Sequence, residues 1–158
     1  MRRIGKEYKD YGGAELLDAI LSCRLLCANF RDYLHTILCS ENLSCYLQIQ
    51  KLKSSTSPEL KIELAKHIIS TYIKVGCAQE INIDDYARQN IAAELEKVTE
   101  TEDVVLAAAY LQENDPFREV EVLLYQLMEK DSVPKYVSGG HMANFFAEFD
   151  WDKAKNTK

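Results

Sequence analysis

The side chains that could do chemistry in this chain are few and scattered. The three histidines, His35, His67 and His141, show neither HExxH spacing nor a carboxylate–histidine pattern. Cys23 and Cys27 are four residues apart, so one helix face could present both to a metal ion, but the apolar setting "ILSCRLLCANF" favours two buried thiols. No GxSxG, P-loop or dinucleotide fingerprint occurs. We therefore expect no catalytic residue, no metal site and no cofactor.

Composition further narrows the classes of protein to which this chain could belong. The chain has 158 residues, 47% of them apolar, which suits one well-buried domain. Its formal net charge of -6 opposes nucleic-acid binding. No apolar run approaches the roughly 20 residues that cross a bilayer, and the five cysteines include no CxxC pair. These features predict a cytoplasmic protein with reduced thiols and no stable membrane insertion, and we expect a monomer.

The remaining candidates are polar side chains beside predicted helix ends, together with one leucine: Glu41, Asn42, Asn82, Asp84, Leu127, Asp131, Ser132 and Lys135. Taken singly, each has an ordinary structural explanation. An acid is favourable in a first helical turn, asparagine shapes turns, and aspartate caps helices. None of these explanations predicts that separate segments meet on one surface. The elements that carry the side chains therefore decide the interpretation.

Helical periodicity interrupted by short joints predicts an all-α chain. Ser57 and Pro58 are a typical N-cap and first helical residue, and Gly76 is typical of the residue past a helix end. The expected helices cover about 14–27, the stretch from Phe30 to Ile37, 40–53, 58–75, one helix after a cap at Asp84, one after a cap at Asp115, and a short one before Gly139 and Gly140.

Two stretches of this helical pattern call for a finer prediction. In 40–53 we expect one inner stripe made of Leu43, Tyr46, Leu47 and Gln50. The stretch "EKVTETEDVVLAAAYLQEND" is acidic at both ends and alanine-rich in its middle. It is either a longer helix end or an added short helix.

The order of the helices predicts where the polar clusters lie. Neighbouring helices joined by short loops run antiparallel, so alternate loops fall at the same end of a bundle. If the four main helices start near Ser40, Ser57, Asp84 and Asp115, three segments share one end, namely 39–42, 80–84 and 127–135. We therefore expect the eight candidate residues to form one docking surface.

Three motifs, in order, resemble those of the regulator of G-protein signalling (RGS) domain. The stretch "NFRDYLHTILCSENLSCYLQIQKLK" resembles its opening motif, "EINIDDYAR" its central Val-Asn-Leu-Asp segment, and "FREVEVLLYQLMEKDSVPKYV" its closing motif. The resemblance spans about Leu17 to Phe146, most of the chain. It implies an all-α fold of about nine helices, with an antiparallel four-helix bundle beside a smaller subdomain formed by the two chain ends. We expect the domain at 14–148, an N-terminal extension at 1–13 and a C-terminal tail at 149–158.

The resemblance also implies a function. Proteins of this family bind the switch regions of an activated heterotrimeric G-protein α subunit (Gα) and accelerate its GTP hydrolysis, which would recruit this protein to the inner face of the plasma membrane. By position, Glu41 and Asn42 would meet one switch, and Asn82 would reach towards the glutamine that orients the attacking water. Leu127, Asp131, Ser132 and Lys135 would hold the other side, with Asp131 near a switch threonine.

The sequence departs from the family pattern at several positions. Cys39 and Ser40 stand where the family has Ser-Glu, Tyr46 replaces a tryptophan, and Lys135 replaces an arginine that braces the aspartate. Lys135 lies four residues after Asp131, one helical turn away, so we expect the lysine to orient that carboxylate. The segment between Arg88 and Phe117 is longer than usual by about a dozen residues. Two alternatives stay open: a scaffold of the same fold that binds Gα or a receptor-associated partner without accelerating hydrolysis, and a thiol redox sensor that uses Cys39 and Cys45.

Overall fold

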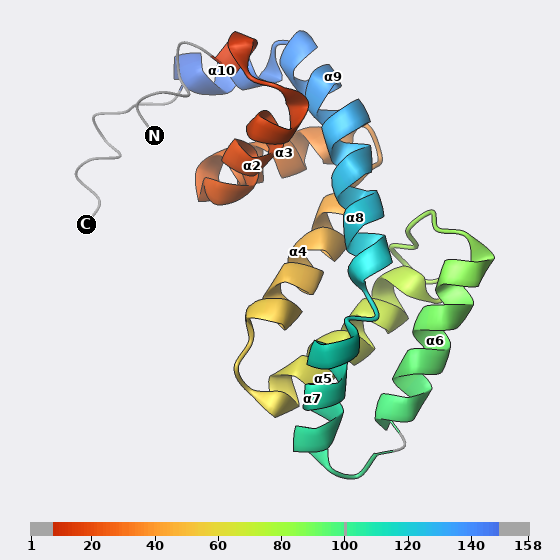
Figure 1. Ribbon diagram of the computed structural model, residues 1–158. Helices are drawn as coiled ribbons and strands as arrows, with labels where there is room; N and C mark the ends of the chain where they lie inside the picture. The colour runs from red at the N-terminus through yellow and green to blue at the C-terminus, as the bar shows by residue number, and fades with distance from the viewer. Residues whose placement is uncertain (1–7, 100, 149–158) are drawn as a thin grey trace. The chain divides into compact units, whose positions relative to one another are not determined.

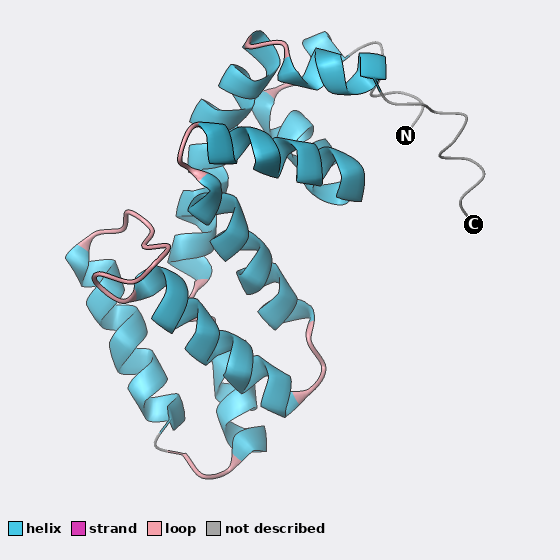
Figure 2. Cartoon of the chain, turned by 180° about the vertical axis from the view of Figure 1, so that it is seen from behind, coloured by secondary structure: helices cyan, strands magenta, loops and turns pink. Residues whose placement is uncertain are grey.

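The computed structural model describes residues 8–99 and 101–148 (Figure 1). The predicted tail at 149–158 and the first seven residues of the predicted extension lie outside these ranges. Helices joined by loops and turns make up the described residues, and no strand occurs among them (Figure 2). The nine α-helices are α2 (Gly13–Ser22), α3 (Arg24–Thr36), α4 (Ser40–Ser54), α5 (Pro58–Ile68), α6 (Asp85–Thr99), α7 (Val104–Asn114), α8 (Arg118–Leu127), α9 (Val133–Ser138) and α10 (His141–Glu148).

Three short helices of other types complete the set. A 3-10 helix, η1, covers Tyr8–Asp10, and two π-helices cover Ile69–Ile73 (η2) and Met128–Ser132 (η3). The all-α prediction is confirmed. Within the described ranges, no helix has the length and apolar character needed to span a bilayer.

The chain divides into two compact units. A terminal unit contains the described residues 8–40 and 127–148, and a central unit contains residues 41–126. The two chain ends thus share one unit, as the resemblance implied. Each unit has its own buried side chains and is described by itself below.

In the terminal unit, α2 packs on α3, η3 and α9, and α10 packs on α3 and α9. Leu17, Ile20, Phe30 and Tyr136 are fully buried there. The prediction of one helix over 14–27 is wrong, because Cys23 is extended (φ -110°, ψ 106°) and separates α2 from α3. The residue ends one helix and begins the next, since its N–H donates to the Ile20 carbonyl and its own carbonyl accepts from Cys27.

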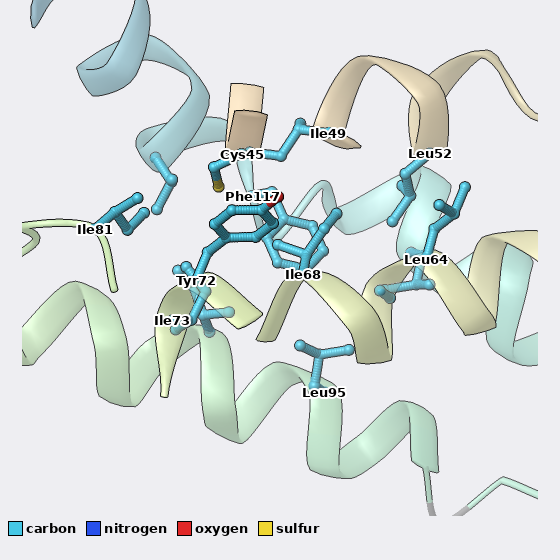
Figure 3. Close-up of a cluster of buried hydrophobic side chains, with 14 of the residues drawn as sticks. Cys45, Ile49, Leu52, Leu64, Ile68, Tyr72, Ile73, Ile81, Leu95 and Phe117 are labelled. Atoms are coloured by element: carbon cyan, nitrogen blue, oxygen red, sulfur yellow. The ribbon is translucent and has the colours of Figure 1, made fainter. Parts of the chain in front are cut away.

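The central unit encloses a core to which α4, α5, η2, α6, α7 and α8 all contribute (Figure 3). The predicted stripe on α4 is only partly correct, because Leu43 is buried but Tyr46, Leu47 and Gln50 are partly exposed. The buried face of α4 further consists of Cys45, Ile49 and Leu52, which also repeat at helical spacing. Two sets of residues on α4 repeat at helical spacing. The core contains the set whose side chains are smaller, either aliphatic or a thiol.

The start of α5 is as predicted, and its end differs. Ser57 Oγ accepts a hydrogen bond from the N–H of Leu60 at 3.2 Å, and Pro58 is the first helical residue. After Ile68 the backbone widens into the π-helix η2, whose C-cap is the extended residue Lys74. Gly76 lies two residues further on in a left-handed turn (φ 75°), so the glycine shapes the turn that follows the helix.

The alanine-rich stretch forms a separate helix, which was one of the two alternatives. Asp103 caps α7 by accepting hydrogen bonds from the N–H groups of Val105 (2.9 Å) and Leu106 (3.1 Å). Ala107 and Leu111 of α7 enter the same core as α5 and α6. The predicted capping role of Asp115 is wrong, because this residue ends α7 in a left-handed conformation (φ 40°) and α8 begins at Arg118.

Candidate protein-docking site

In the central unit, Asn82 lies between η2 and α6 in a tight turn, where the N–H of Ile83 donates to the Ile81 carbonyl at 3.1 Å. The segment alternates, with Ile81 and Ile83 buried and Asn82 and Asp84 exposed. The N–H of Ile81 donates to the Tyr72 carbonyl at 2.9 Å, which fixes the segment against the end of η2. Because both flanking isoleucines are anchored in the core, the Asn82 side chain is presented to solvent. The predicted exposure of Asn82 is confirmed.

Arg88 anchors this loop by its side chain, and it was not among the site residues predicted from the sequence. Its guanidinium donates to the carbonyls of Ile73 and Ile81, the latter at 3.4 Å, and pairs with the Glu80 carboxylate at 3.0 Å. The other Glu80 oxygen accepts from the N–H of Gly76 at 2.7 Å. One largely buried side chain thus ties the end of η2 to both sides of the loop. Its signal in the sequence is an arginine one helical turn after a capping aspartate.

Asp84 and the α4 pair take the local roles expected of them. Asp84 Oδ1 accepts from the N–H of Ala87 at 2.7 Å and so caps α6. Glu41 and Asn42 lie in the first turn of α4, where each is partly exposed and the acid lies beside the positive end of the helix.

In the terminal unit, Leu127 to Lys135 form a continuous helical path. Leu127 and Val133 both have α-helical backbone angles on either side of the π-turn of η3, so the helix does not stop before Pro134. Pro134 lies in the first turn of α9, directly after the widened turn in which the Val133 N–H donates to the Met128 carbonyl. Leu127 is 38% exposed, so part of its apolar side chain is accessible.

Asp131 and Lys135 form the ion pair that their spacing predicted. Lys135 Nζ lies 2.7 Å from Asp131 Oδ1, and both side chains are more than half exposed. The hydrogen bond that Lys135 donates to this carboxylate, together with the negative charge of the carboxylate, raises the pKa of Lys135. The ion pair therefore orients the Asp131 carboxylate, which is exposed to solvent.

Ser132 departs from its predicted exposure. The residue is 4% exposed, because the wide turn of η3 points it inward, so its side chain is not available on this surface.

Tyr33 is a neighbour of Asp131 and Lys135 that the prediction missed. Its buried ring lies against those of Tyr136 and His141, with centroids 5.3 and 4.6 Å away. Burial raises the pKa of Tyr33, and the charges of Lys135 and Asp131 also act on it.

The structure gives little support for a metal site or for a redox-active thiol. The described residues contain no cluster of His, Cys, Asp or Glu that could hold a metal ion. Burial raises the pKa of the Cys45 thiol to about 12, and the charge of Cys77 contributes to this rise. A thiol that stays protonated at neutral pH is a poor redox sensor. The alternative that used Cys45 is therefore disfavoured.

The site thus consists of two groups. A central group contains Glu41, Asn42, Asn82 and Asp84, and a terminal group contains Leu127, Asp131 and Lys135. In each group, a packed element holds side chains that are exposed or partly exposed, so these side chains are available to a partner. That the two groups converge on one surface stays a prediction.

Comparison with known proteins gives the family. The model of the regulator of G protein signaling domain matches residues 16–140, most of the chain. This chain therefore belongs to the RGS domain family, as the three motifs indicated.

Individual relatives agree with this assignment. The chain is 31% identical over 124 residues to Regulator of G-protein signaling 8 of Danio rerio, which covers 78% of this chain and 63% of that protein. It is 27% identical over 135 residues to Regulator of G-protein signaling 5 of Bos taurus, with 84% and 64% covered. Developmental regulator flbA of Emericella nidulans is 27% identical over 150 residues, with 86% and 21% covered. The chain thus spans less than two thirds of the length of these relatives.

Proposed function

We propose that this chain is a GTPase-activating protein for Gα, with no catalytic chemistry of its own, and that it shortens the signal by speeding GTP hydrolysis. Family membership and the names of the relatives support this proposal. In it, the central and terminal groups contact the switch regions of the same GTP-bound Gα, at the cytoplasmic side of the membrane that carries Gα. The chain acts as a monomer.

The mechanism requires stabilisation of mobile segments rather than new reactive groups. Gα supplies its arginine in cis and a glutamine that orients the attacking water. A partner accelerates hydrolysis if it holds the switches in the arrangement of the transition state, because only interactions that strengthen there lower the barrier. Asn82 contacts the switch that carries the glutamine, Glu41 and Asn42 contact a neighbouring segment, and Asp131 accepts a hydrogen bond from a switch threonine.

The observation that carries the proposal is the fixed presentation of Asn82. The side chain is exposed while its two neighbours are buried, and the backbone around it is bonded to η2 and to Arg88. A polar group held in this way loses little conformational freedom when it binds. Such preorganisation is what stabilisation of a transition state requires.

Single-turnover GTP hydrolysis by Gα tests the proposal. Gα loaded with GTP is mixed with magnesium, with and without this chain, and phosphate release is followed. We expect a higher rate constant in the presence of the chain. We also expect the tightest binding to Gα carrying GDP and a fluoride mimic of the transition state. Equal affinity for the GDP form and the mimic-loaded form would exclude the activating role.

The second candidate is a scaffold that binds Gα or a receptor-associated partner without accelerating hydrolysis. Two observations favour it, namely the burial of Ser132 and the lysine at position 135. A lysine offers charge but not the planar double hydrogen bond of an arginine, so the terminal group grips less firmly. Binding to Gα with an unchanged rate of hydrolysis would select this candidate.

A further inference from the structure

A hollow of about 550 Å³ opens in the central unit where α4 gives way to α5, with α7 alongside. Its lining includes Lys53, Thr56, Lys61, Gln112 and Asp115. None of the residues proposed to contact Gα lines it. Binding to Gα therefore does not account for the charged and polar side chains of this hollow.

Lys61 is the unusual member of this lining. The residue is 8% exposed, and its Nζ donates to Gln112 Oε1 at 2.8 Å. No carboxylate in the described part of the chain lies within ion-pair distance of this ammonium. A neutral amide does not balance the charge of an ammonium, which makes its strongest hydrogen bonds to anions. The hollow thus contains a cation that lacks an anion.

Lys53, the other lysine of the hollow, is already neutralised. Its Nζ lies 2.7 Å from Asp115 Oδ2 and also contacts Glu121. Although burial lowers the pKa of Lys53, its hydrogen bonds to the two carboxylates raise it overall. An anion entering the hollow would therefore meet Lys61 as its free partner, and Asp115 would oppose it less because Lys53 holds its charge.

Four hydroxyl residues in a row, 54–57, form the rim beside Lys61. Three of them are engaged: Ser54 Oγ donates to the Lys51 carbonyl at 3.2 Å, Ser55 Oγ to the Ser57 carbonyl at 3.4 Å, and Ser57 caps α5. Thr56 is exposed, lies between the two helices, and makes no side-chain hydrogen bond with any described residue. Its hydroxyl is the one in this run that an enzyme could reach without breaking a bond.

We propose that Thr56 is a phosphorylation site and that its phosphate binds in this hollow, against Lys61. A protein kinase transfers the γ-phosphoryl group of ATP: the bond between Thr56 Oγ1 and phosphorus forms, the bond from phosphorus to the bridging oxygen breaks, ADP leaves, and the hydroxyl proton passes to the kinase. The phosphate brings a charge of about -1.5 to -2 at neutral pH. It lies just before the first turn of α5, where the helix dipole also favours an anion.

This inference does not depend on the proposed role at Gα. Its consequence is local, since the phosphate would join the end of α4 to α5 through Lys61. We expect phosphorylation to stabilise the central unit.

The test compares the whole chain with and without phosphothreonine introduced at position 56. We expect the modification to raise Tm by roughly 2 to 4 °C. The increment should vanish in Lys61→Met, which keeps the length of the side chain but removes its charge, and persist in Lys66→Met, which removes an exposed lysine from the same helix. Equal increments in both variants, or a lower Tm on modification, would overturn the proposal.

Two further measurements do not rely on the fold of a variant. In ³¹P NMR of the modified chain, the second pKa of the phosphate should lie below its ordinary value of about 6; the ordinary value would show that no cation is bound. The unmodified chain is also incubated with ATP and a kinase that favours basic residues before its target, since Lys53 lies three residues before Thr56. Mass spectrometry should place the phosphate on Thr56, and its absence there would contradict the proposal.

Discussion

The ammonium of Lys135 lies 2.7 Å from a carboxylate oxygen of Asp131, one turn earlier on the helical path from η3 into α9. Two exposed side chains of opposite charge at this spacing restrict one another's rotamers. Asp131 is therefore oriented before any partner arrives. A lysine makes this contact through one ammonium, whereas an arginine could hold both oxygens of the carboxylate.

The pair predicts coupled effects on Gα binding. Lys135→Arg should keep or modestly raise GTPase activation, because the charge remains and the grip on Asp131 improves. Lys135→Glu should weaken binding sharply. Asp131→Ala should also weaken it, and Lys135→Ala added to Asp131→Ala should cost little more. Dissociation constants for the two single variants and the double variant measure the coupling. Losses that multiply to within about a factor of two would show that the residues act independently.

Asn82→Ala should lower the acceleration of hydrolysis while leaving the fold intact. Loss of one well-placed polar contact in a transition state costs about 2 to 4 kcal/mol. Because the side chain is exposed and the loop is held by its neighbours, far-UV circular dichroism and Tm should not change. Gln79→Ala, at a nearby exposed position, is the control and should have no effect. An unchanged single-turnover rate for Asn82→Ala would remove Asn82 from the site.

Arg88→Met should loosen the loop that presents Asn82. The substitution leaves the Ile73 and Ile81 carbonyls and the Glu80 carboxylate without their shared donor. We expect the free energy of unfolding in urea to fall by about 1.5 to 3 kcal/mol. Amide exchange at Ile81 and Asn82 should rise more than exchange in α7. Arg88→Lys should recover only part of the loss, because lysine lacks the fork. Uniform acceleration of exchange across the central unit would contradict this local role.

Asp103→Ala should destabilise α7 and with it the core of the central unit. The carboxylate caps two N–H groups, and loss of such a cap costs about 1 kcal/mol. The neighbouring exposed residue provides a matched control, Glu102→Ala, which removes a charge but no cap. Thermal unfolding of the two variants makes the comparison. If both lower Tm equally, the effect is one of net charge.

Local signals in the sequence predicted two helix caps of the central unit and the exposure of Asn82. Ser57 and Asp84 lie where caps are required, and the alternation of "INID" matches the burial of Ile81 and Ile83. The spacing of Asp131 and Lys135 also sufficed to predict their contact. Each of these features depends on residues within a few positions of one another.

Features set by tertiary packing were not predictable in this way. Cys23 breaks a continuous apolar pattern because α2 and α3 pack on each other. Asp115 has the composition of an N-cap, but its carboxylate pairs with Lys53, far away in sequence. Arg88 acts on carbonyls of η2 and the loop, and its place one helical turn after Asp84 does not show which carbonyls it reaches. The burial of Ser132 follows from a π-turn that reads as ordinary helix in the sequence.

The π-helix η2 gives its segment some tolerance to a change of length. Relative to an α-helix, a π-turn accommodates one additional residue per turn. Deleting one residue of Ile69–Ile73 would let the wide turn close into an α-helical turn, so the residues on either side would keep their directions. The same deletion within the regular helix α5 would rotate every later residue by about 100° about the helix axis. A single-residue deletion should therefore disturb the position of Asn82 less in η2 than in α5.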